Sequence, residues 1–102
     1  AMNSLLVNTP DILLNKTKLE ISIFPNPARE NIKIYTHNDY FIRRGLLRMF
    51  NAFGNEVLVL ENIQSDNFDL KIDGLPEGLY IIKVDDLETN LSTTGKIVVQ
   101  RR

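Results

Sequence analysis

The chain has 102 residues, no cysteine, 43% apolar residues and a formal net charge of −1, so it is long enough for one domain with a single modest core. The near-neutral charge argues against a nucleic-acid module, whose affinity depends on a clear basic excess, and the lack of cysteine excludes disulfides, thiolate metal sites and a cysteine nucleophile. No apolar run approaches the roughly 20 residues that span a bilayer, so we expect no membrane insertion.

The first 18 residues show no sustained hydrophobic period, and they lack the basic and apolar regions of a secretory signal. We expect residues 1–18 to be a linker, with Ala1 and Met2 left over from cloning, and residues 19–102 to form the domain. The chain is therefore expected to be a fragment of a longer protein whose signal peptide lies upstream.

From Leu19 onward, apolar residues recur at every second position over short runs, which is typical of antiparallel strands with one buried face. The segments that alternate most clearly are 19–23, 31–35 and 68–72. Other short runs, rich in β-branched or bulky apolar residues, are also predicted as strands. These are 46–51, 57–60, 79–84 and 96–100.

Turn residues separate these runs. Pro25 and Pro27 must end the first strand, because each removes a backbone donor. Gly54 can take the left-handed position of a hairpin loop, and residues 74–78 form a second turn. Residues 36–45 are expected to be a loop and residues 85–94 a polar hairpin tip. A single open sheet would leave an apolar face bare, so the seven segments predict an all-β, seven-stranded antiparallel β-sandwich of immunoglobulin-like type.

Side chains that could carry chemistry are few. One histidine, His37, cannot build a zinc site without partners, so we expect it to be an exposed loop residue. The serines lie in no nucleophile context, and the acidic residues of 66–73 and 85–88 do not follow calcium-loop spacing. We therefore predict no catalytic residue, no metal site, no cofactor and no enzyme activity. The basic pairs at 43–44 and 101–102 are expected to be solvated surface, and Tyr35 and Phe50 to lie on outer strand faces.

Three segments occur in order and at suitable spacing. They are 21–28 (ISIFPNPA) with the strand 31–34, then 49–57 (MFNAFGNEV), then 75–84 (LPEGLYIIKV) closed by 95–100 (GKIVVQ). Together they resemble the C-terminal sorting domain of the type IX (Por) secretion system, in its type A form, over residues 19–100. The chain departs from that pattern at Asn51, where aspartate is common, at Gly95, which replaces the first lysine of a terminal pair, and in its longer loop 36–45.

The resemblance implies an export address in a Gram-negative bacterium. Such a domain directs its parent protein from the periplasm through an outer-membrane translocon to the cell surface or the medium, and a sortase usually removes it, here by a cut in or before residues 1–18. The expected partners are the translocon and the sortase, with no nucleic acid, and exposed edge strands also allow a homodimer. The alternative is a carbohydrate-binding or adhesion sandwich appended to a secreted enzyme.

The terminal strand is the candidate recognition element, because an exposed edge strand recruits partners by strand addition. Its residues are Lys96, Ile97, Val98, Val99 and Gln100. The remaining motif residues are expected to be structural, with Tyr80 in the core and its hydroxyl at the rim. These are Pro25, Asn26, Pro27, Gly54, Gly78 and Tyr80.

Overall fold

The computed structural model describes residues 18–101, and within them it contains seven strands and no helix. The expected linker therefore lies outside the described residues except for Lys18, as does Arg102. No helix in the described part of the chain is long and apolar enough to cross a membrane. The strands are β1 (Ile21–Phe24), β2 (Asn31–Thr36), β3 (Ile42–Asn51), β4 (Glu56–Ser65), β5 (Asn67–Lys71), β6 (Gly78–Asp86) and β7 (Leu91–Val99).

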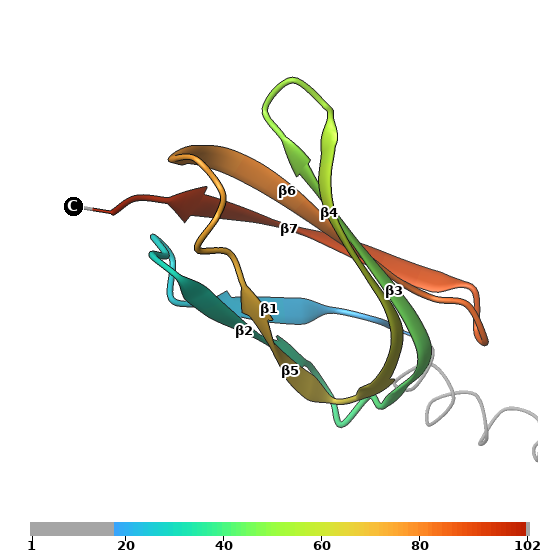
Figure 1. Cartoon of the computed structure of the whole chain (residues 1–102). Helices are drawn as coiled ribbons and strands as arrows, with labels where there is room; N and C mark the ends of the chain where they lie inside the picture. Colours follow the sequence, from blue (N-terminus) through green and yellow to red (C-terminus); the bar gives the residue numbers. More distant parts are fainter. Residues whose placement is uncertain (1–17, 102) are drawn as a thin grey trace, which may run out of the picture.

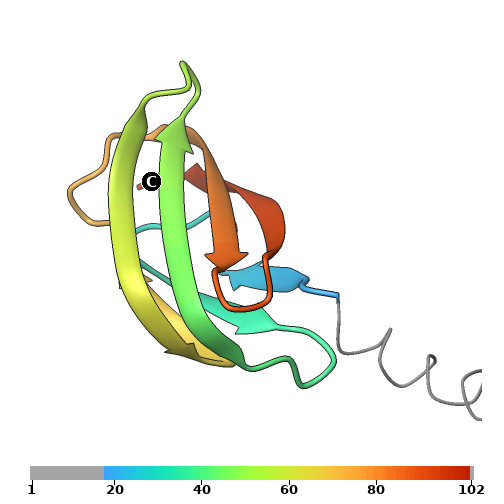
Figure 2. The same cartoon turned by 90° about the vertical axis from the view of Figure 1, so that its right-hand side faces the viewer.

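The strands form two antiparallel sheets that pack face to face, which confirms the predicted sandwich. The smaller sheet has the order β1-β2-β5 and the larger sheet the order β4-β3-β6-β7. Figure 1 shows the two layers, and Figure 2 shows how the strands of the larger sheet lie side by side. Since neither sheet closes on itself, β1, β5, β4 and β7 are edge strands.

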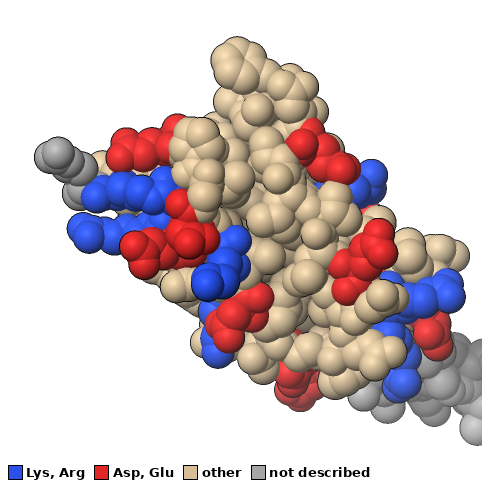
Figure 3. Space-filling model, in the orientation of Figure 1, with Lys and Arg blue, Asp and Glu red and all other residues tan. Residues whose placement is uncertain are grey.

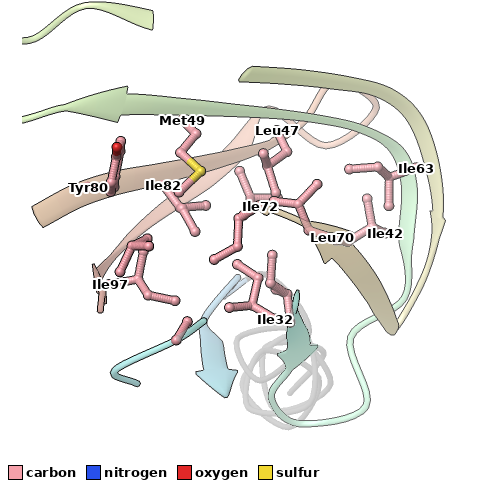
Figure 4. Packing of buried hydrophobic residues seen from close by; sticks show 14 of the residues in the cluster. Ile32, Ile42, Leu47, Met49, Ile63, Leu70, Ile72, Tyr80, Ile82 and Ile97 are labelled. Carbon is pink, nitrogen blue, oxygen red and sulfur yellow. The ribbon is translucent and has the colours of Figure 1, made fainter. Parts of the chain in front are cut away.

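The core is made of the inward-facing residues of both sheets, as the period-two pattern requires. Ile32 and Leu70 come from the smaller sheet, and Leu47, Ile82 and Ile97 come from the larger one, all at most 6% exposed. Figure 4 shows these side chains meeting between the layers. The burial alternates along β6, from Tyr80 to Asp86, so the strand has one face in the core and one face toward water.

Several strands are longer than the sequence predicted. β3 begins at Ile42 and not at 46, β4 continues to Ser65, and β7 begins at Leu91. The predicted loop 36–45 and hairpin tip 85–94 are therefore wrong in extent. Polar residues conceal the strand ends because they occupy the wet face, and bulges interrupt the alternation where the β3–β4 register shifts.

The position of Asp86 also differs from the prediction, because this residue does not lie in a solvated hairpin tip. Its side chain is fully buried and is the one buried charged group among the described residues. The carboxylate accepts hydrogen bonds from the Tyr40 hydroxyl at 2.9 Å, from the Arg43 and Arg44 amides at 3.3 Å each, and from the Glu88 amide at 3.1 Å. It thereby satisfies backbone donors at the irregular start of β3 and in the β6–β7 turn.

Candidate functional site

The motif segments, which are far apart in the sequence, meet at one end of the sandwich. This end, called here the motif end, consists of segment 25–28, the β3–β4 turn at 51–55, the turn at 74–78 and the terminal segment 96–101. In Figure 1 the C-terminal label marks the terminal segment, with the β1–β2 connection and the β5–β6 turn near it, and the β3–β4 turn projects at the top of the view. The contacts described next hold segment 25–28 and the turn at 74–78 to the terminal segment.

Segment 25–28 pairs with the terminal strand. The Ala28 amide donates to the Val98 carbonyl at 2.8 Å, and the Gln100 amide donates to the Ala28 carbonyl at 2.8 Å. Asn26 adds two side-chain bonds: its Oδ1 accepts from the Val98 amide at 3.0 Å, and its Nδ2 donates to the Lys96 carbonyl at 3.3 Å. Asn26 therefore acts as a substitute strand residue between two prolines that have no amide hydrogen to offer.

These bonds occupy the edge of β7 at the predicted recognition residues. Ile97 and Val99 point into the core and are at most 1% exposed, and Val98 is 38% exposed. The side chains of Lys96 and Gln100 are also exposed. The outward backbone groups of Val98 and the Gln100 amide already have partners, so the open part of this edge lies earlier in β7.

Arg101 corrects the prediction of a solvated basic pair at the end of the chain. Its guanidinium donates to the Leu75 carbonyl at 2.6 Å and to the Ile72 carbonyl at 2.9 Å. Its amide donates to a Glu77 carboxylate oxygen at 3.2 Å. The planar guanidinium reaches two carbonyls at once, and it thereby fixes the turn at 74–78 against the terminal segment.

The two remaining turns are built by residues of the motifs. Asn51 Oδ1 accepts the amides of Phe53 and Asn55 at 2.9 and 3.0 Å, an acceptor role that aspartate can also fill. Gly54 has a φ of 87°, the left-handed position predicted for this loop. Tyr80 is 3% exposed, and its hydroxyl donates to the Pro76 carbonyl at 2.6 Å, like the tyrosine corner of other sandwiches.

The outward face of the larger sheet is apolar beside the motif end and charged farther along. Phe50 lies opposite Ile81, and Leu79 lies opposite Val98, and Leu79 is 45% exposed. The charged part holds Arg48, whose guanidinium bonds the Asp85 carboxylate at 3.2 Å, and Lys83 at 3.9 Å from the same carboxylate. A partner at the motif end would therefore meet apolar side chains bordered by charge.

His37 lies in the β2–β3 loop, at the other end of β1 from segment 25–28, and is partly exposed and hydrogen-bonded there. Its Nε2 lies 2.6 Å from Ser22 Oγ, and its Nδ1 lies 3.7 Å from Glu20 Oε1. The side chains of His37 and Glu20 are about half exposed, at 42% and 48%. The Ser22 bond ties β1 to the β2–β3 loop. Within residues 18–101, no group of three or more histidines, cysteines and acids is placed to hold a metal ion.

Comparison with known families decides what the motifs mean. The model of the secretion system C-terminal sorting domain matches residues 22–100. The chain belongs to this family. The sorting domain therefore has the role of a C-terminal secretion signal, which takes its parent protein to the cell surface or the extracellular space. The family is one of sorting signals and not of enzymes. No curated protein matches the sequence.

Two solved structures from Porphyromonas gingivalis contain a similar fold. One is PorZ, described as an essential bacterial surface component of the type IX secretion system, at 16% identity and a TM-score of 0.59 over 79% of the sorting domain. The other is dimeric latent PorU, at 16% identity and a TM-score of 0.61 over 82%. The sorting domain spans only 11% and 9% of those chains, so the likeness concerns the fold.

The pairings of two site residues gave no signal in the sequence. Ala28 and Arg101 bind partners 70 and 29 residues away in the chain, counting from Ala28 to Val98 and from Ile72 to Arg101. Alternation and turn chemistry report only on near neighbours, so neither pairing could have been predicted from the order of residues.

Proposed function

We propose that the outer-membrane translocon of the type IX system recognises the motif end of this sorting domain after the parent protein has entered the periplasm of a Gram-negative cell. The observation that carries the proposal is the meeting of three separated motifs around the terminal segment, where segment 25–28 pairs with β7 and Arg101 fixes the turn at 74–78. A surface assembled from distant segments exists only in the folded domain, so the signal is read as a fold.

The exposed side chains of segment 96–100 are the proposed contacts. Since the outward backbone groups of Val98 and the Gln100 amide are already bonded, strand addition at this point would first have to displace segment 25–28. Side-chain recognition needs no such step. Lys96 and Val98 point outward from β7 and adjoin the apolar residues Leu79 and Ile81, which together offer an amphipathic surface.

The domain carries no activity of its own in this scheme. A sortase cuts upstream of β1, in or before residues 1–18, once the parent protein has crossed the membrane. The folded domain is then discarded, and the parent is released or retained at the surface. The domain does not have to catalyse a reaction at any step, because recognition and cleavage are both performed by the partners.

The test fuses residues 3–102 behind a periplasmic reporter in a host that has the secretion system. The wild-type domain and a Ser92→Asp control, changed at an exposed position of the same strand, are expected to export the reporter. Lys96→Glu and Val98→Asp are expected to leave it in the periplasm while keeping the circular dichroism spectrum of the wild type. A wild-type fusion that stays in the periplasm, beside an authentic sorting domain that is exported, would show the proposal to be wrong.

A further inference from the structure

The four sheet edges differ in how open they are to a new strand. β1 and β5 have four and five residues, and β5 carries Asp69 and Lys71 on its exposed side, which discourages pairing. β7 is bonded to segment 25–28 over its last residues. β4 has ten residues and pairs only with β3, so it offers the longest edge with unpaired backbone groups.

The usable part of the β4 edge is short and well delimited. The β3–β4 register shifts at Val57 and again at Asn62, which has a φ of 60°, and such bulges end regular pairing. The apolar run 57–60 begins at the first bulge and ends before the second, and its Val59 is 42% exposed on the outward face. Leu58 and Leu60 face inward and are only partly buried. An added strand would cover side chains on both faces of the sheet.

This stretch projects from the body of the molecule. Figures 1 and 2 show the β3–β4 hairpin extending beyond the smaller sheet, and β4 pairs with no strand other than β3. Figure 3 shows mainly uncharged surface over the hairpin, with acidic side chains beside it. Phe53 at its tip is 90% exposed. An extended chain could therefore approach the edge without displacing a segment of the domain.

Charge selects the kind of strand that fits. Glu56 and Glu61 bracket the apolar run, β4 contains no lysine or arginine, and neither glutamate forms an ion pair among the described residues. Opposite charges across paired strands stabilise a sheet and like charges destabilise it. Two copies of β4 paired with each other would bring four glutamates into one interface, so the charges disfavour a second copy of this chain.

We propose that β4 is a strand-addition site for an extended, apolar peptide segment of a partner protein that carries basic residues on both sides of its apolar core. Main-chain hydrogen bonds to the β4 edge supply the affinity, and the two glutamates select the flanking cations. The site lies on the opposite edge of the larger sheet from β7. It follows the β3–β4 turn of the motif end but includes none of the proposed contacts at 96–100, so it does not rest on the proposed function.

The test uses the isotope-labelled full chain and two synthetic peptides. Both have a core of alternating valine and threonine; one is flanked by lysines and the other by glutamates. Titration followed by NMR is expected to shift the amide signals of 56–61 and of the facing part of β3. The lysine-flanked peptide is expected to bind at least tenfold more tightly than the glutamate-flanked one.

Three variants separate edge pairing from non-specific attraction. Val59→Lys, which puts a charge on the edge strand, should weaken binding of the lysine-flanked peptide at least tenfold. Glu61→Lys should shift the preference toward the glutamate-flanked peptide, a gain that misfolding cannot produce. Thr94→Lys, at an exposed position on the other edge of the sheet, is the matched control and should bind like the wild type.

The proposal is overturned by shifts confined to β7, by equal affinity for both peptides, or by the absence of binding at millimolar peptide. It is also overturned if the β4 signals depend on protein concentration without peptide, because a second copy would then occupy the edge. None of these results bears on export by the wild-type fusion, so the failure of this proposal and the failure of the proposed function are distinguishable.

Discussion

At the scale of single residues, Asp86 is the side chain that we expect to matter most for the stability of the fold. It is buried at the end of β6, and four hydrogen bonds to its carboxylate link Tyr40, the irregular start of β3 and the β6–β7 turn. A buried carboxylate is tolerated only where such donors replace water. The bonds are also local evidence that the bulge at 43–45 is a built feature and not a defect.

Replacing Asp86 should therefore be costly. Asp86→Ala leaves the Tyr40 hydroxyl and three amides without this acceptor, and we expect it to lower the free energy of unfolding by about 3 kcal/mol. Asp69→Ala is the control, since Asp69 is exposed and its ion pair with Lys33 at 3.5 Å should contribute less than about 1 kcal/mol. Urea unfolding measures both, and equal losses would contradict the role given to Asp86.

Asp86 also predicts that the domain loses stability at acid pH. Burial on its own raises the pKa of Asp86, but the hydrogen bonds from Tyr40 and from the backbone amides outweigh it and hold the pKa below its ordinary value of 3.8. A carboxyl with a lowered folded pKa contributes stability above its unfolded pKa, and that contribution is lost as the pH falls through the folded pKa. Unfolding at stepped pH should show a loss below about pH 4, and Asp86→Asn should lack that part of the loss.

Tyr40 predicts that the domain also loses stability at alkaline pH. Burial raises the pKa of its hydroxyl above 10.0, and the neighbouring Asp86 carboxylate adds to this against the bond to Thr89. A raised folded pKa means that the stabilisation is complete below the unfolded pKa and is lost as the pH rises through the folded one. Stability measured from pH 9 upward should fall, and a flat profile would contradict the buried contact.

At the scale of elements, two glycines in the larger sheet test how closely the layers and strands approach. A Cβ on Gly45 would lie 2.6 Å from Ile42 Cγ2 and 2.8 Å from Ile63 Cβ, whereas a Cβ on Gly95 would lie 2.7 Å from Ile23 Cδ1. The Cδ1 is the end of a flexible side chain and can turn away, but Ile63 Cβ is fixed to the backbone of β4. Gly95, which departs from the family pattern, therefore sits at an inward position against β1.

We expect Gly45→Ala to lower the free energy of unfolding by about 2 kcal/mol, the usual cost of forcing extra volume into a packed site. Gly95→Ala should cost less than half as much, because Ile23 can adjust. Denaturant unfolding of the two variants, prepared side by side, measures the difference. A larger loss at Gly95 than at Gly45 would show that β1 is packed more rigidly than the contacts indicate.

Segment 25–28 gives a second prediction at this scale. Asn26→Ala removes both side-chain bonds to β7, so the Val98 amide should exchange its hydrogen faster, by roughly tenfold for about 1.4 kcal/mol of lost protection. Asn31→Ala, at the exposed start of β2, is the matched control. Unchanged exchange at Val98 in the Asn26 variant would mean that the Asn26 side chain does not protect this amide.

Sequence patterns predicted which segments form strands, but they did not predict where the strands end or which distant residues pair. Alternation located β1, β2 and β5, and short runs rich in β-branched or bulky apolar residues located the other four strands. These patterns missed the ends of β3, β4 and β7, where bulges and polar wet-face residues hide the period, and they placed Asp86 in solvent because a lone aspartate in a polar stretch gives no sign of burial. The pairing of Asn26 with Val98 spans 72 residues, beyond the reach of any local rule.

At the scale of the whole molecule, the terminal strand completes the core. Ile97 and Val99 are buried between the sheets, so deleting residues 96–102 should abolish the cooperative unfolding transition seen by circular dichroism. Ile97→Ala is the graded form of the same test and should cost about 3 kcal/mol. Val98→Ala, at the outward position between them, should cost under about 1 kcal/mol; a truncated domain that still unfolds cooperatively would contradict this view.

The bond between Asn26 and Val98 also has a consequence for the biosynthesis of the parent protein. A chain that terminates prematurely, or loses its tail to a protease before Lys96, retains segment 25–28 but has nothing for it to hold. If the translocon recognises the motif end as proposed, such a product would lack the assembled signal and would not be exported. Export would in this way be restricted to molecules whose synthesis has run through β7.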